Sequence, residues 1–173
     1  MPSRTYTFGV SRDSLIIEYA DWALDVEEDA LERGQPLNWR MRAIAWDIGV
    51  IDMDRVRVLS VPEIPFPIHN PFLCVAAEQL GFRAHGFLVQ GQVFGHAILI
   101  AGPETEWTVA LLAHELTHVA QVERAGSFLD FLTQYLGEVE EFGYANSPLE
   151  REAHFVGDCY RDESYPTGSI DDQ

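Results

Sequence analysis

The segment EWTVALLAHELTHVAQVERA, residues 106–125, is the most informative part of this chain. It lacks Gly and Pro and is followed by Gly126, a typical helix stop, so we expect one helix over 106–125. His114 and His118 are four residues apart and therefore lie one turn apart on the same face. Both imidazoles can bind one metal ion there, and the intervening Glu115 can take a proton from a metal-bound water. This arrangement is typical of zinc hydrolases.

A catalytic zinc ion normally has three protein ligands and a water, so a third ligand is expected outside this helix. Downstream, Ser127 is a good N-cap for a second helix over 128–142. The turn 144–148 follows and ends in a proline, which suits the first position of a third helix. Glu150 lies in the first turn of that helix, near its partly positive end, and is the candidate third ligand.

An HExxH helix, a connecting helix and a helix with the pattern E-x-x-A together resemble the gluzincin class of zinc metallopeptidases. More narrowly, residues 55–155 are similar to small bacterial HExxH proteins, many of which are uncharacterised. The shared phrases are HELTHVAQ at 114–121, FL and YL at 131–132 and 135–136, GYANSPLEREA at 143–153, and weaker matches at 57–59 and 65–67. The resemblance covers roughly 100 of the 173 residues.

The resemblance implies that His114, His118 and Glu150 are ligands of a Zn²⁺ cofactor and that Glu115 is the general base. In many gluzincins the residue four after the ligand Glu is Asp or Asn, which orients the first histidine. Here His154 stands at that place. We expect His154 to lie behind Glu150 and to hydrogen-bond His114 or a nearby carbonyl, without binding the metal itself.

Two other residues remain candidates for the third ligand, namely Glu152 and His154. Glu152 lies about 200° around the helix from Glu150, so these two carboxylates cannot both face the metal. Tyr144 lies in the turn before the ligand helix, where its phenol can stabilise a metal-bound oxyanion or simply fill the core. We count Tyr144 with Glu115 as the candidate catalytic residues.

The amino-acid composition limits the classes of partner that the protein is expected to bind. The formal net charge of −17 argues against nucleic acid and against an anionic membrane surface. No segment is long and apolar enough to insert into a membrane or to serve as a signal peptide, so a cytoplasmic location is the default and export by a non-classical route stays open. The two cysteines fit a reducing compartment. The expected partner is a peptide or protein substrate, and the oligomeric state is not predicted.

We expect a single α+β domain, a minimal gluzincin-like fold in which a small β-sheet packs against the HExxH helix and two further C-terminal helices. Region 1–54 is expected to be helical and part of this domain, 55–161 to be the metallopeptidase-like core, and the acidic tail 162–173 to be flexible. Further helices are expected over 13–33 and 72–80, a shorter helical or irregular stretch over 39–46, and strands over 55–61 and within 86–101. The strand at 95–101 has two open interpretations, an edge strand that pairs with substrate and a buried strand.

The function that these residues predict is hydrolysis of peptide bonds by a metal-activated water. Two alternatives stay open. The first is a catalytically quiet zinc-binding module that recruits a partner protein, although such a module has no need of Glu115. The second is a metal-free structural domain with a coincidental HExxH, although the E-x-x-A helix at a suitable distance counts against it.

Overall fold

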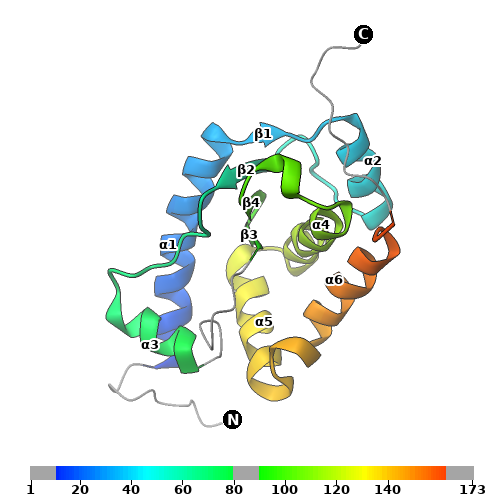
Figure 1. Ribbon diagram of the computed structural model, residues 1–173. Helices are drawn as coiled ribbons and strands as arrows, with labels where there is room; N and C mark the ends of the chain where they lie inside the picture. Colours follow the sequence, from blue (N-terminus) through cyan, green and yellow to red (C-terminus); the bar gives the residue numbers. More distant parts are fainter. Residues whose placement is uncertain (1–10, 80–89, 163–173) are drawn as a thin grey trace.

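The computed structural model describes residues 11–79 and 90–162, which form one α+β domain and confirm the predicted fold class. The described elements, in chain order, are α1 (Arg12–Arg33), β1 (Gln35–Pro36), α2 (Trp39–Ile48), β2 (Arg57–Val61), α3 (Pro71–Gln79), β3 (Gly91–Phe94), β4 (Ala97–Ala101), η1 (Glu104–Glu106), α4 (Val109–Ala125), α5 (Phe128–Phe142), η2 (Tyr144–Asn146) and α6 (Pro148–Cys159) (Figure 1). The tail at 163–173 and the first part of the strand region at 86–101 lie outside the described residues. No helix in the described ranges is long and apolar enough to cross a membrane.

The described strands form a mixed sheet in the order β1-β2-β4-β3. Strands β2 and β4 are parallel, with Val58 opposite Ile98, whereas β1 and β3 run antiparallel to their neighbours. Strand β4 is therefore interior, and β3 lies at the edge among the described strands. Of the two interpretations of 95–101, the buried strand is right and the edge strand is wrong, because both backbone edges of β4 are already paired.

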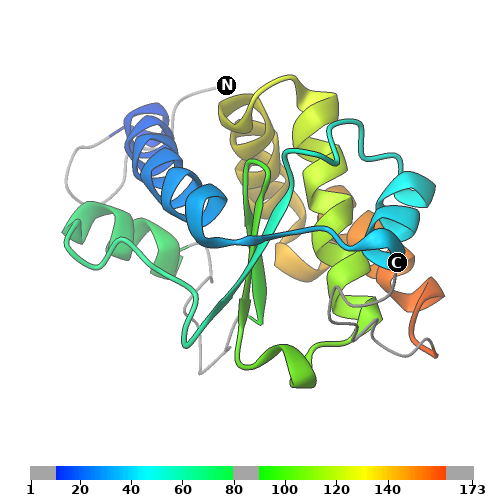
Figure 2. The ribbon, with the colours of Figure 1, turned by 90° about the horizontal axis from the view of Figure 1, so that it is seen from above.

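Helices cover both faces of this sheet, which explains why β4 is apolar at every position. Ile98 and Ile100 belong to the core that contains α4, whereas Ala97 and Leu99 pack with apolar residues of α1. Figure 2 shows the same division, with α1 and α3 on one side of the sheet and α4 and α2 on the other. The HExxH helix thus packs on the face of the sheet that presents Ile98 and Ile100.

Helix α4 begins at Val109, three residues later than the sequence predicts. The reason is local: the side chain of Thr108 accepts a hydrogen bond from the Leu111 amide at 3.0 Å and caps the helix there. At the other end Gly126 adopts the left-handed conformation with φ 91° and closes the helix as predicted. The apolar face of the helix is fully buried (Leu112, Leu116 and Val119).

Helices α5 and α6 close the domain against α4. The bounds of α5 match the predicted 128–142, and Ser147 caps α6 by accepting a hydrogen bond from the Glu150 amide at 3.2 Å. Small residues let α6 approach α4 closely, since a Cβ atom at Gly157 would lie 2.8 Å from the Ala110 carbonyl oxygen. Because the two helices pack this closely, the first turn of α6 lies beside the histidines of α4.

Candidate metal centre

The structure brings His114, His118 and Glu150 together. Their ligand-type atoms all lie within 4.8 Å of one another. The two Nε2 atoms are 3.1 Å apart, and the Glu150 carboxylate oxygens lie 3.6 Å from Nε2 of His114 and 3.5 Å from Nε2 of His118. Ligand atoms around a tetrahedral zinc ion with bonds of about 2.0–2.1 Å are about 3.3–3.4 Å apart. The spacing of this donor set therefore fits a zinc ion.

The hydrogen-bond network fixes the tautomer of His118. The amide nitrogen of Gln121 donates to the Leu149 carbonyl and to Glu152 Oε2, both at 2.9 Å, which orients the amide. Gln121 Oε1 must then accept from His118 Nδ1, which lies 2.7 Å away. A neutral His118 therefore carries its lone pair on Nε2, facing the other two candidate ligands.

The lowered pKa values of His114 and His118 keep both candidate ligands neutral at neutral pH. Burial is the main cause that lowers the pKa of His114 to about 4, with the neighbouring His118 second. Burial likewise lowers the pKa of His118 to about 4. The His114 ring also hydrogen-bonds the backbone of Ala153, on the α6 turn that follows Glu150. Neutral imidazoles are the form that binds a metal, so neither ring needs to lose a proton at neutral pH.

The Glu150 carboxylate is fully buried, and its two oxygens differ. Oε1 accepts a hydrogen bond of 2.6 Å from the hydroxyl of Tyr135 on α5. Oε2 is buried and has no hydrogen-bond partner among the described residues. A buried anionic oxygen without a donor is costly unless a cation neutralises it, so this orphaned atom is the observation that most directly fits a bound metal.

Glu115 lies on the side of α4 that faces the sheet. It is only 3% exposed, and its carboxylate contacts the backbone position of Gly91 on β3. Burial first, and the Glu150 charge second, raise the pKa of Glu115 to about 8. The metal-free chain therefore keeps this carboxyl protonated at neutral pH, and a cation bound by the neighbouring candidate ligands would favour the carboxylate form that a general base requires.

Tyr144 lies in η2, just before the ligand helix, and is 37% exposed. Burial, and then the charges of Glu150 and Glu115, raise the pKa of its phenol well above the ordinary value. The phenol therefore stays protonated at neutral pH, and it hydrogen-bonds the side chain of Glu150. Its role at an oxyanion stays a prediction.

The two rival third ligands are placed differently from Glu150. Glu152 accepts hydrogen bonds from Gln121 and from Arg124, whose NH2 lies 2.7 Å from Oε2. The His154 side chain is 57% exposed, and its Nε2 lies 3.7 Å from Glu150 Oε2. Its ring contacts His114 with centroids 4.7 Å apart. His154 thus borders the ligands from the solvent side, through a ring contact with His114.

Sequence reasoning missed two supporting residues, Gln121 and Tyr135. Gln121 follows His118 by three residues on the same stripe of α4, and a polar residue there signals a partner for the ring. The helical spacing of Tyr135 predicts only a place in the core. Its hydroxyl was the available signal, because a buried tyrosine normally has a hydrogen-bond partner.

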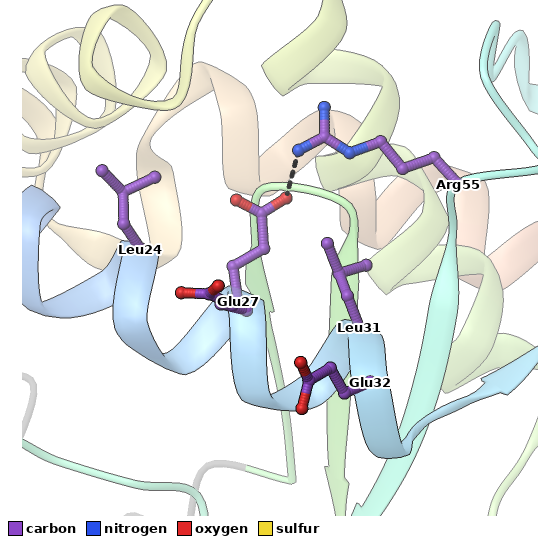
Figure 3. Close-up of a pocket in the computed structure, with 6 residues that line it drawn as sticks. Leu24, Glu27, Leu31, Glu32 and Arg55 are labelled. Carbon is purple, nitrogen blue, oxygen red and sulfur yellow. Dashed lines mark hydrogen bonds and ion pairs between the residues drawn. The ribbon is translucent and has the colours of Figure 1, made fainter.

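His96 lies outside the group of candidate ligands. His96 Nε2 is 3.2 Å from Glu123 Oε1, and its backbone amide donates to Glu27, so it ties the β3–β4 turn to α4 and α1. Figure 3 shows Glu27 beside Arg55 in a shallow depression of about 430 Å³ on α1, which contains none of the three candidate ligands. Glu27 Oε1 accepts hydrogen bonds from Arg55 NH2 at 3.2 Å and from the His96 amide at 3.0 Å, so this carboxylate has a structural role between α1 and the turn at His96. His85 lies outside the described residues.

The sequence matches no family model, no curated protein and no solved structure.

Tyr135→Phe is expected to weaken zinc binding about 10- to 100-fold, because the hydroxyl that orients Glu150 is lost while the ligands remain. The dissociation constant is measured by competition with a chromophoric chelator. Tyr160→Phe is the matched control, since its hydroxyl also contacts a carboxylate, Asp47 at 3.2 Å, outside the donor set. Equal affinities for the two variants would show that Tyr135 does not support the ligand.

Proposed function

We propose that this protein is a zinc-dependent metallopeptidase. The observation that carries the proposal is the convergence of His114, His118 and Glu150 around an orphaned, buried carboxylate oxygen. A structural zinc site is closed by four protein ligands, whereas three ligands leave a position for water. Glu115 on the same helix gives that site a base, which supports hydrolysis over metal storage.

Each side chain of the site has its own role in the proposed hydrolysis. A zinc ion held by the three ligands would lower the pKa of its water and polarise a scissile carbonyl. Glu115 takes the proton from that water and passes it to the leaving amine. Tyr144 donates a hydrogen bond to the oxyanion that develops on the carbonyl. Gln121 and Tyr135 keep the ligands oriented during these steps.

The position of β3 favours an extended peptide as the substrate. This strand lies at the edge of the described sheet, and its first residue, Gly91, contacts Glu115. An extended peptide can add to an edge strand through backbone hydrogen bonds, which do not depend on the peptide's sequence. A peptide bound there would pass close to the proposed base.

The proposal is tested by metal content together with hydrolysis. We expect about one zinc per chain by elemental analysis of the wild type, loss of that zinc in His114→Ala, and cleavage within a broad peptide library that stops when zinc is chelated. Stoichiometric zinc in His114→Ala would overturn the site. Zinc binding without cleavage of any peptide would overturn the peptidase and favour the partner-recruiting module.

A further inference from the structure

Gly91 begins the edge strand β3, at a position where a strand gains nothing from glycine. Its backbone is not among the left-handed glycines of the described chain, which are Gly49, Gly95, Gly102, Gly126 and Gly143. Any L-residue can therefore adopt the conformation at Gly91. A reason for glycine must come from the space around it.

That space is filled by one side chain. A Cβ atom at Gly91 would lie 2.4 Å from Oε1, 2.8 Å from Cδ and 3.0 Å from Cγ of Glu115. At Gly34, by contrast, the nearest atoms belong to the backbone of Ala30 and Val58 and to Arg57. The absence of a side chain at Gly91 is thus matched specifically to Glu115.

The helix backbone at Glu115 is held in place by packing, so the carboxylate is the part that must move. Leu112 and Leu116, which lie near Glu115 on α4, are fully buried in the core that contains the sheet. The side chain is itself 3% exposed, so the carboxylate cannot move aside into open solvent without leaving its present site. A methyl group at position 91 would therefore displace the carboxylate and leave the helix in place.

We propose that Gly91 is a positioning residue: the bare backbone of β3 holds open the space in which the Glu115 carboxylate lies beside the candidate metal ligands. The consequence for hydrolysis rests on the proposed function. The contact itself does not, because it depends only on packing between β3 and α4. The two parts are therefore tested separately.

The first test is a thermal unfolding cycle of four chains: wild type, Gly91→Ala, Glu115→Ala and the double variant. We expect Gly91→Ala to lower Tm by a few degrees, about 3 °C or more, in the wild-type background. With Glu115 shortened to Ala the added methyl group has room, so the drop should disappear. Gly34→Ala is the control, and its drop should be the same in both backgrounds because its neighbours do not include Glu115.

A drop of equal size for Gly91→Ala in both backgrounds, or no drop in either, would overturn the proposal. If Gly91→Ala fails to fold while the double variant folds, the coupling is shown in its strongest form. If both fail to fold, position 91 is constrained by something other than Glu115 and the proposal is wrong.

The second test measures zinc binding and hydrolysis by Gly91→Ala. We expect zinc affinity to stay within about threefold, because the ligands do not move, and kcat to fall about 100-fold with KM little changed. Full kcat in Gly91→Ala would overturn the positioning role even if the unfolding cycle shows coupling. A wild type that cleaves nothing would overturn the proposed function, and the unfolding cycle would still decide the contact between Gly91 and Glu115.

Discussion

Replacing Glu115 by Gln is expected to remove hydrolysis and leave zinc bound. The amide preserves the volume that packs against β3 but cannot take a proton from water, and general-base catalysis typically contributes about 10²- to 10⁴-fold. We therefore expect kcat to fall by that factor on any peptide that the wild type cleaves. Zinc content by elemental analysis should stay at the wild-type level, since His114, His118 and Glu150 are untouched.

Glu123→Gln is the matched control on the same helix. The two Glu123 oxygens accept hydrogen bonds from the backbone amides of Ile51 and Asp52 at 2.7 and 2.8 Å, so this side chain fixes a loop away from the metal centre. We expect Glu123→Gln to lower stability with little effect on kcat. Hydrolysis by Glu115→Gln at the wild-type rate would show that Glu115 is not the base.

The raised pKa of Glu115 gives a separate prediction for metal-free protein. Folding raises this pKa from 4.5 to about 8, mainly through burial, so the folded chain keeps a proton that the unfolded chain releases over this range. The stability that this proton contributes is fully present below pH 4.5 and is lost as the pH rises through 8. The neutral amide of the Glu115→Gln variant does not ionise and escapes the loss.

Metal-free Glu115→Gln should therefore become more stable than the wild type as the pH is raised from about 5 to about 9. The expected gain is on the order of a few kcal/mol in the free energy of unfolding. Denaturant titrations with a chelator present, at several pH values, measure it. A difference between the two chains that does not change with pH would contradict the buried position of the Glu115 carboxylate.

Elements that depend on local signals could be predicted well from the sequence. The bounds of α5 follow from Ser127 as N-cap and from the glycine that ends the helix, and both signals act within one turn. The predicted α4 is too long because 106–108 lacks a breaker within the expected helix. In the structure the helix begins after Thr108, because the Thr108 side chain accepts a hydrogen bond from the Leu111 amide and caps the helix there.

The sheet could not be predicted in the same way, because pairing joins segments far apart in the chain. Residues 34–36 lie between the helix expected over 13–33 and the helical or irregular stretch expected over 39–46 and are not predicted as a strand, yet Gln35 and Pro36 pair with β2 as the short strand β1. The apolar run at 97–101 fits an edge or an interior strand equally well until its partners are known. The parallel pairing of β2 with β4 decides for the interior strand.

The candidate site shows the same division between local and distant information. His114 and His118 share a face because of helix geometry alone, whereas Glu150 reaches them only through the crossing of α6 over α4. The resemblance to gluzincins predicts Glu150 as the third metal ligand. Tyr135 could not be placed beside it from spacing, because its role depends on the angle between α5 and α6.

Zinc is expected to stabilise the protein strongly, and Glu150→Gln to abolish this effect. A ligand that binds only the folded state at about 100 to 1,000 times its dissociation constant adds about 2.7–4.1 kcal/mol. For a chain of this size we expect Tm to rise by about 5–15 °C when zinc is added to metal-free wild type. Glu150→Gln removes the anionic ligand, so the zinc-dependent rise in Tm should fall below about 2 °C in this variant.

Metal-free Glu150→Gln should still fold, which makes the comparison valid. Its amide oxygen can accept the Tyr135 hydroxyl as Glu150 Oε1 does at 2.6 Å. Its amide nitrogen would replace the buried oxygen that has no partner among the described residues, and it would lie close to the lone pair of a histidine Nε2. Losing an uncompensated buried charge should raise the Tm of the metal-free protein.

Glu152→Gln and His154→Ala change the two rival ligands on the same helix, and both should keep most of the rise with zinc. If His154→Ala loses that rise while Glu150→Gln keeps it, the roles assigned to these two residues must be exchanged.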